Sequence, residues 1–183
     1  KEQQDWDSVH SFLDEISQVS HVEDWMCFRV AIARAKSVVY ADYQKQTDKA
    51  NNILESLPQL TDPNAIFLVN YTKGCFASNA GKNEQAVIFL TQAETSEGDG
   101  FVFYRLDNTK RLAVEKSRQR DWKTAQSLCI NIIHRIGNSE GKRLLVWERI
   151  EMFGELAFIH WSNGRFLRAF ASMYGFVMRL VND

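Results

Sequence analysis

The chain has 183 residues, of which 45% are hydrophobic and 25% are charged, a composition typical of a folded globular protein rather than a disordered chain. Its 22 basic and 23 acidic side chains leave a net charge of -1, which excludes a general attraction to nucleic acid or to anionic membranes. The chain contains only two prolines, Pro58 and Pro63, so long helices can form almost without interruption.

The cysteines and the chain ends carry information about the protein's surroundings. Cys27, Cys75 and Cys129 are an odd number of widely separated thiols, which predicts reduced cysteines in a cytoplasmic protein. No apolar run approaches the roughly 18 residues of a membrane span, so we expect no membrane segment. The chain begins with Lys1 and its last helical pattern runs almost to Asp183, and we therefore expect a segment of a longer polypeptide.

Apolar residues recur at helical spacings of three and four along almost the whole chain, whereas strand-like alternation is nearly absent. The apolar stripes and stop signals predict about nine helices, near residues 5–18, 22–43, 46–57, 63–80, 83–95, 101–119, 122–136, 140–162 and 164–182. Asp62 followed by Pro63 predicts the cap and first residue of one of them. Because most connections are short, successive helices are expected to pack antiparallel in an all-α fold.

Small residues recur at corresponding positions in the predicted hairpins. The second helix of each hairpin carries an early alanine, and these are Ala50, Ala86, Ala125 and Ala169. Twelve residues before the last three alanines stand Gly74, Ala113 and Ala157, whereas the first copy has Val38 there. Small side chains at a helix crossing allow a short distance between the helix axes, so the pattern predicts closely packed helical hairpins.

This pattern resembles the tetratricopeptide repeat, in which small residues on both helices let the hairpin close tightly. The resemblance implies stacked hairpins in a right-handed superhelix, forming one domain over residues 1–183. The repeat-like units would cover 22–57, 63–95, 101–136 and 140–182, after an extra N-terminal helix at 1–18. The alanine spacings of 36, 39 and 44 residues are similar to those of divergent repeats in sensor arms of signal-transducing NTPases and of maltose-regulator-type bacterial activators.

The resemblance also implies a binding surface, because the first helix of each tetratricopeptide hairpin lines a concave groove. Carried onto this sequence, the groove positions are Tyr71, Cys75, Ser78, Asn79, Lys110, Val114, Ser117, Arg118, Phe158, Trp161 and Ser162. The middle group is cationic and the last is aromatic, and arginine and aromatic residues dominate binding hot spots. The alternative for Phe158 and Trp161 is a place in the hydrophobic core.

Residue patterns of catalysis or metal binding are missing from the sequence. The four histidines, His10, His21, His134 and His160, lie on different predicted helices without the ligand spacing of a zinc site. Neither GxSxG nor HExxH occurs, and the glycines of residues 96–100 lack the Lys-Ser or Lys-Thr of a phosphate loop. We interpret Glu151 and Glu155, one turn apart, as a solvated helix face. We therefore expect neither an enzyme nor a metal or cofactor site.

The sequence predicts a protein-interaction or sensor scaffold that binds a peptide, a partner with an acidic element, or other domains of the same polypeptide near Lys110 to Arg118. The alternative is a small-ligand receptor arm of a bacterial regulatory protein, which would hold a sugar or signalling molecule between Phe158 and Trp161. Nucleic-acid binding through Arg105 to Lys123 is a weaker third hypothesis because three acidic residues interrupt that stretch.

Overall fold

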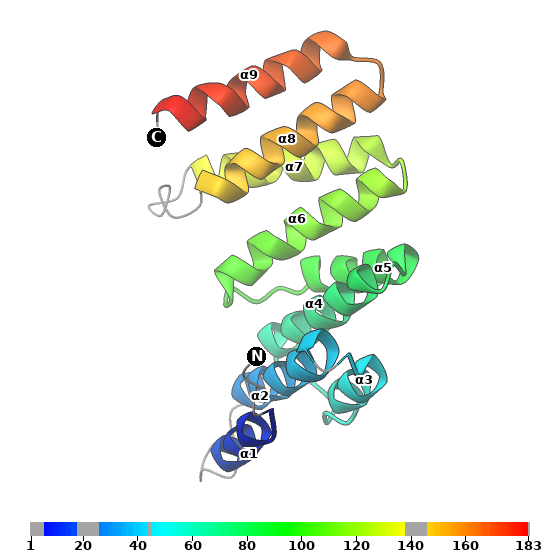
Figure 1. Ribbon diagram of the computed structural model, residues 1–183, viewed down its shortest axis with the longest axis vertical. Coiled ribbons are helices and arrows are strands. Elements are labelled where there is room, and N and C mark those ends of the chain that lie inside the picture. The colour runs from blue at the N-terminus through cyan, green and yellow to red at the C-terminus, as the bar shows by residue number, and fades with distance from the viewer. Residues whose placement is uncertain (1–5, 18–25, 44, 138–145, 183) are drawn as a thin grey trace, which may run out of the picture. The chain divides into compact units, whose positions relative to one another are not determined.

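The computed structural model describes residues 6–17, 26–43, 45–137 and 146–182. Within these ranges the chain forms nine α-helices, one π-helical segment and no strand (Figure 1). The all-α prediction is therefore confirmed. The predicted bounds agree with the observed ones to within a few residues, except that residues 22–25 and 140–145, expected as helix, lie outside the described ranges.

The chain divides into two compact units, residues 1–104 and residues 105–183. Unit 1 contains α1 (Trp6–Ser17), α2 (Met26–Val38), the π-helical segment η2 (Val39–Tyr43), α3 (Thr47–Glu55), α4 (Pro63–Asn79) and α5 (Asn83–Glu94). Helix α6 (Val102–Arg118) begins at the end of unit 1 and continues into unit 2. Unit 2 also contains α7 (Trp122–Gly137), α8 (Val146–Ser162) and α9 (Phe166–Asn182).

Helix α4 begins as its sequence predicts. The Oδ1 atom of Asp62 accepts hydrogen bonds from the amides of Asn64 at 2.7 Å and Ala65 at 3.1 Å, and Pro63 occupies the first helical position. The helix packs along α5, with Gly74 against Leu90 at the crossing. The close approach expected from the small residues is therefore present in this hairpin.

Four hairpins each turn at a residue with a positive φ. The residue five positions before each alanine of the sequence pattern has a positive φ: Lys45 at 59°, Gly81 at 71°, Arg120 at 62° and Gly164 at 68°. All four alanines, Ala50, Ala86, Ala125 and Ala169, are at most 1% exposed. The local geometry therefore repeats along the chain although the corner residues differ.

The corners at Gly81, Arg120 and Gly164 also share their hydrogen bonds. At the first of them, the amide of Gly81 donates to the carbonyl of Ser78 at 3.0 Å, and the amide of Lys82 donates to that of Ala77 at 2.9 Å. The same pair of bonds follows α6 and α8. This is the Schellman motif, which satisfies the last carbonyls of a helix and reverses the chain.

The first hairpin differs from the others by one residue. A π-helix holds one more residue per hydrogen-bonded turn than an α-helix, and the amide of Gln46 accordingly donates to the carbonyl of Tyr40 at 2.7 Å, six positions back. The hydroxyl of Ser37 donates to the carbonyl of Ala50 at 3.0 Å. The small residue facing Ala50 is therefore Ser37 rather than Val38, because the π-helical segment adds one residue to the spacing.

The core of unit 2 is formed by three helices. Its buried members are Leu106 and Ala113 of α6, Ala125, Cys129, Ile132 and Ile136 of α7, and Met152, Leu156 and Ile159 of α8. Helix α9 packs along α8 (Figure 1). These contacts hold the ends of α6 and α8 beside the start of α7, which is where the candidate site lies.

Candidate functional site

A groove of about 880 Å³ opens in unit 2 at the C-terminal ends of α6 and α8. Its lining residues are Val114, Ser117 and Arg118 of α6, Arg120 in the corner, Trp122 at the start of α7, and Glu155, Phe158 and Ser162 of α8. The consecutive helices α6 and α7, together with α8, thus supply cationic, aromatic and hydroxyl side chains to one surface.

The Arg118 side chain, which lines the groove, is held by the buried carboxylate of Glu115. Its Nη1 atom donates to Oε1 of Glu115 at 2.6 Å, and the Glu115 side chain is only 1% exposed whereas that of Arg118 is 53% exposed. The pair lies one helical turn apart on α6. A charge-assisted hydrogen bond of this kind fixes the arginine in place while leaving part of its guanidinium open to solvent.

The charges at the start of α7 are mostly compensated. Asp121 accepts a hydrogen bond from the amide of Thr124 at 3.3 Å, and its Oδ2 atom lies 3.5 Å from Nζ of Lys116. Burial alone would raise the pKa of Asp121, but the hydrogen bonds from Thr124 and the ammonium of Lys116 together lower it. Lys116 and Asp121 therefore neutralise each other beside the groove.

Arg120 differs from these residues. It is exposed, it lines the groove, and its guanidinium has no hydrogen-bond or ion-pair partner in the described part of the chain. Its backbone adopts φ of 62°, a conformation that costs an L residue roughly 1–2 kcal/mol and costs glycine nothing. The groove therefore contains one uncompensated cation held in an unfavourable backbone conformation.

The aromatic side of the groove is formed by two rings. The ring centroids of Trp122 and Phe158 lie 6.4 Å apart at an interplanar angle of 67°, an edge-to-face arrangement. Phe158 is 55% exposed, so it lies at the surface rather than in the core. Among the described residues that line the groove, Glu155 is the acidic one.

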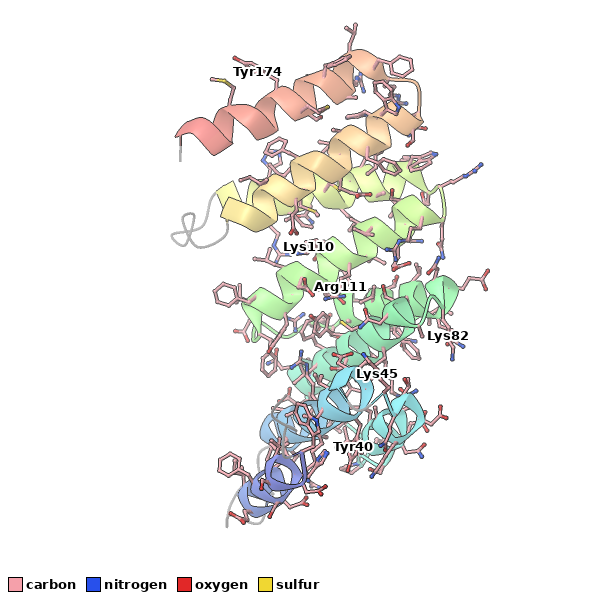
Figure 2. The ribbon with its side chains drawn as sticks, viewed as in Figure 1. Tyr40, Lys45, Lys82, Lys110, Arg111 and Tyr174 are labelled. Atoms are coloured by element: carbon pink, nitrogen blue, oxygen red, sulfur yellow. The ribbon has the colours of Figure 1, made fainter. Side chains whose placement is uncertain are left out.

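The structure brings five of the predicted site residues together, namely Val114, Ser117, Arg118, Phe158 and Ser162. Lys110 also belongs to α6 and lies near α8 (Figure 2), but its Nζ atom is 2.8 Å from Oε2 of Glu151 and 3.6 Å from Oδ1 of Asp107. Its charge is thus already paired within unit 2. Arg120, Trp122 and Glu155 were missed, although Arg120 could have been found as the residue five positions before Ala125.

The predicted site residues of unit 1 lie elsewhere. Tyr71 is only 4% exposed and stacks on Phe67 with ring centroids 5.9 Å apart. Its ring also lies 5.5 Å from that of Tyr104, over which the Arg34 guanidinium sits at 4.4 Å. Tyr71 is therefore a buried member of an aromatic cluster. Ser78 is half-buried and Asn79 is exposed, both in the last turn of α4.

Described residues also line two smaller hollows. One of about 320 Å³ lies between α8 and α9 and includes Trp161 and Phe158 in its lining. The other, of about 420 Å³, lies in unit 1 among α3, α4 and α5, and Lys73 and Lys82 contribute to it. None of the predicted unit 1 residues lines the latter hollow.

Comparisons with protein-family models, with curated proteins and with solved structures found no match for this chain. In the described residues, no group of three or more His, Cys, Asp or Glu side chains is arranged to hold a metal ion. No helix in the described ranges has both the length and the apolar character needed to cross a membrane.

Proposed function

We propose that this chain is a helical-repeat interaction module that binds an acidic segment of a partner protein in the groove formed by α6, α7 and α8. The shared corners and the buried alanines five residues after them support divergent tetratricopeptide-like repeats. Stacking of these hairpins into a right-handed superhelix is part of the same proposal.

The observation that carries the proposal is that Arg120 combines a positive φ with an exposed guanidinium that has no partner in the described part of the chain. The equivalent corners after α4 and α8 use Gly81 and Gly164, which tolerate positive φ without cost. At the remaining corner Lys45 uses its side chain locally, since its Nζ atom donates to the carbonyl of Asp42 at 2.6 Å. The Arg120 guanidinium makes no such contact within the described residues, which supports a role for its charge in binding.

The chemistry of the lining suggests what the partner segment contains. Arginine guanidinium groups bind carboxylates through parallel hydrogen bonds, so Arg118 and Arg120 favour an aspartate or glutamate between them. Trp122 and Phe158 favour an apolar side chain next to that acid. Glu155 disfavours a second acid on its side of the groove, and it therefore sets the direction in which an acidic peptide lies.

The experiment that tests the proposal begins with selection of binders from a random library of about 12-residue peptides on the immobilised chain. Enrichment of Asp or Glu beside an apolar residue is expected. Affinity of a selected peptide is then measured by fluorescence anisotropy. Arg120→Gly should weaken binding about tenfold, or ~1.4 kcal/mol, and Arg120→Lys should have an intermediate affinity, because it keeps the charge but loses the parallel hydrogen bonds.

The Arg120→Gly variant distinguishes a loss of binding from a loss of folding. Glycine relieves the backbone strain, so reduced binding accompanied by a raised melting temperature cannot result from unfolding. Arg118 is unsuitable for the same purpose, because its removal also disturbs buried Glu115. Arg135→Ala, at an exposed cation in the last turn of α7, serves as the matched control and should leave affinity unchanged. Unaltered affinity of Arg120→Gly, or selected peptides without acidic residues, would contradict the proposal.

A second candidate function, a small-ligand receptor, is favoured by the size of the groove. Its volume of about 880 Å³ falls within the roughly 300–1,000 Å³ typical of small-molecule sites. Thermal-shift measurements with sugars, sugar phosphates and nucleotides would detect such a ligand. A rise in melting temperature that is lost in Phe158→Ala would favour this function over peptide binding, and no rise with any of these compounds would count against it.

A further inference from the structure

Helix α9 exposes a broad apolar surface. Among its described side chains, five large apolar residues are at least half exposed: Phe166 at 50%, Leu167 at 87%, Phe170 at 60%, Met173 at 52% and Tyr174 at 67%. At 100° per residue these side chains share one arc of about 120°. Tyr174 projects from α9 on the side opposite to α8 (Figure 2).

Helix α8 extends this surface. Phe158 and Trp161 are 55% and 56% exposed, and the rings of Trp161 and Phe166 pack edge to face with centroids 4.9 Å apart. Between the two helices lies the hollow of about 320 Å³, whose lining also includes Gly154, Ala157, Ala169 and Met173. Soluble monomers rarely expose a contiguous apolar surface of this kind, which indicates that something covers it.

We propose that a second copy of this chain covers the surface, with α9 packed against α9 of its partner about a twofold axis. One surface carries both protruding side chains and an apolar hollow, and a twofold interface requires this self-complementarity. A cavity of about 150 Å³ holds a benzene ring, so the hollow of about 320 Å³ has room for an aromatic side chain such as Phe170 of the partner subunit.

The exposed area is sufficient for such an interface. Aromatic side chains bury roughly 150–250 Å² each, so the five half-exposed aromatic residues of α8 and α9, with Leu167 and Met173 beside them, offer about 700 Å² per copy. A standard stable interface takes about 800 Å² from each partner. The apolar core of the surface and a few residues at its rim together reach that size.

The charges near the surface are compatible with pairing of two copies. At 100° per residue, Arg165 and Arg168 fall outside the apolar arc. The charges of both arginines act on the imidazole of His160, which is buried near the C-terminal end of α8. The arc itself holds no charge among its described side chains, so two identical surfaces meet without repulsion. The surface is independent of the peptide groove except at Phe158, which borders both.

Sedimentation velocity of the full chain tests the proposal between about 1 and 100 µM. We expect a closed dimer of twice the 21.2 kDa chain mass that dissociates on dilution. Leu167→Glu and Phe170→Glu should each convert it to a monomer, because each places a carboxylate in the apolar contact. Ile88→Glu on α5, which is 54% exposed, is the matched control and should leave the dimer intact.

Circular dichroism and melting temperature establish that the variants stay folded, as expected for exposed positions. A monomer over the whole concentration range would overturn the proposal and leave the surface to a different protein. A dimer that survives both glutamate substitutions would place the interface elsewhere and overturn it too. A mass that keeps growing with concentration would show an open head-to-tail contact in place of the twofold one.

Discussion

A Cβ atom on Gly74 would lie 2.6 Å from Cδ2 of Leu90 and 3.3 Å from the backbone nitrogen of the same residue. Leu90 is fully buried, so its side chain has no solvent to move into. Helices α4 and α5 therefore cross at a distance that only a hydrogen atom at position 74 permits. A larger side chain at position 74 would therefore push the two helices apart.

Replacement of Gly74 by alanine should destabilise the fold by about 1–3 kcal/mol, because the extra methyl overpacks the crossing. Gly154→Ala is the matched control within a helix, since nothing lies within 4 Å of a Cβ atom there. Alanine is the better helix former, so this control should gain up to ~1 kcal/mol. Urea unfolding followed by circular dichroism measures both free energies, and a stable Gly74→Ala variant would refute the close crossing.

The two equivalent corners at Arg120 and Gly164 should respond with opposite signs. No atom lies within 4 Å of a Cβ atom built on Gly164, so Gly164→Ala adds only the strain of φ 68° and should cost about 1 kcal/mol. Arg120→Gly should raise stability by a similar or smaller amount, because glycine accepts φ of 62°. Thermal unfolding compares them, and changes of the same sign would argue against a shared corner geometry.

Cys129 should be unreactive in the folded protein. Burial, with a smaller contribution from the charge of Glu155, raises the pKa of its thiol to about 12, and the thiolate is the reactive form. Iodoacetamide at pH 8 should therefore modify half-buried Cys75 much faster than Cys129. In urea the two rates should become similar. Mass spectrometry of labelled peptides follows both, and equal rates in the native protein would contradict the burial of Cys129.

His160 should make the fold sensitive to acid. Burial, followed by the charges of Arg168 and Arg165, lowers the pKa of its imidazole, and the Nδ1 atom has no hydrogen-bond partner among the described residues. Between this lowered pKa and the ordinary value of about 6.5, the unfolded chain binds the extra proton and the folded chain does not. Stability from the neutral imidazole is therefore complete above about pH 6.5 and is lost as the pH falls below it.

The corresponding measurement is the melting temperature of the wild type and of His160→Gln between pH 7.5 and 5. Glutamine has no titrating group, so the variant should lose less melting temperature over this interval than the wild type. Carboxylates elsewhere titrate equally in both proteins and cancel in the comparison. Parallel curves would show that His160 is protonated without cost.

Much of the fold follows from local features of the sequence. Helical periodicity, the Asp62 cap and the small residues at positions 74, 86, 125 and 169 are visible in the chain because each depends on residues within a few helical turns. The helix bounds and the α4–α5 crossing were predicted on this basis. The sequence also indicated the cationic end of α6, from which Arg118 enters the groove.

Other features depend on contacts between segments far apart in sequence. Lys110 and Arg118 look alike in the sequence, yet Lys110 is paired with Glu151 on α8 whereas Arg118 rests on Glu115 of its own helix. Tyr71 was expected in a groove, but the rings of Phe67 and Tyr104 enclose it. The identity of Ser37 as the small residue of the first hairpin required the π-helical segment, which no periodicity reveals.

The sequence by itself thus determined that this chain is helical, where its helices lie and which small residues draw them together, since these properties arise from the backbone and its nearest neighbours. Only the tertiary structure decided which charges are already neutralised and which side chains share a groove. Electrostatic pairing and exposure are properties of the packed chain, in which residues 41 positions apart in sequence come within hydrogen-bonding distance.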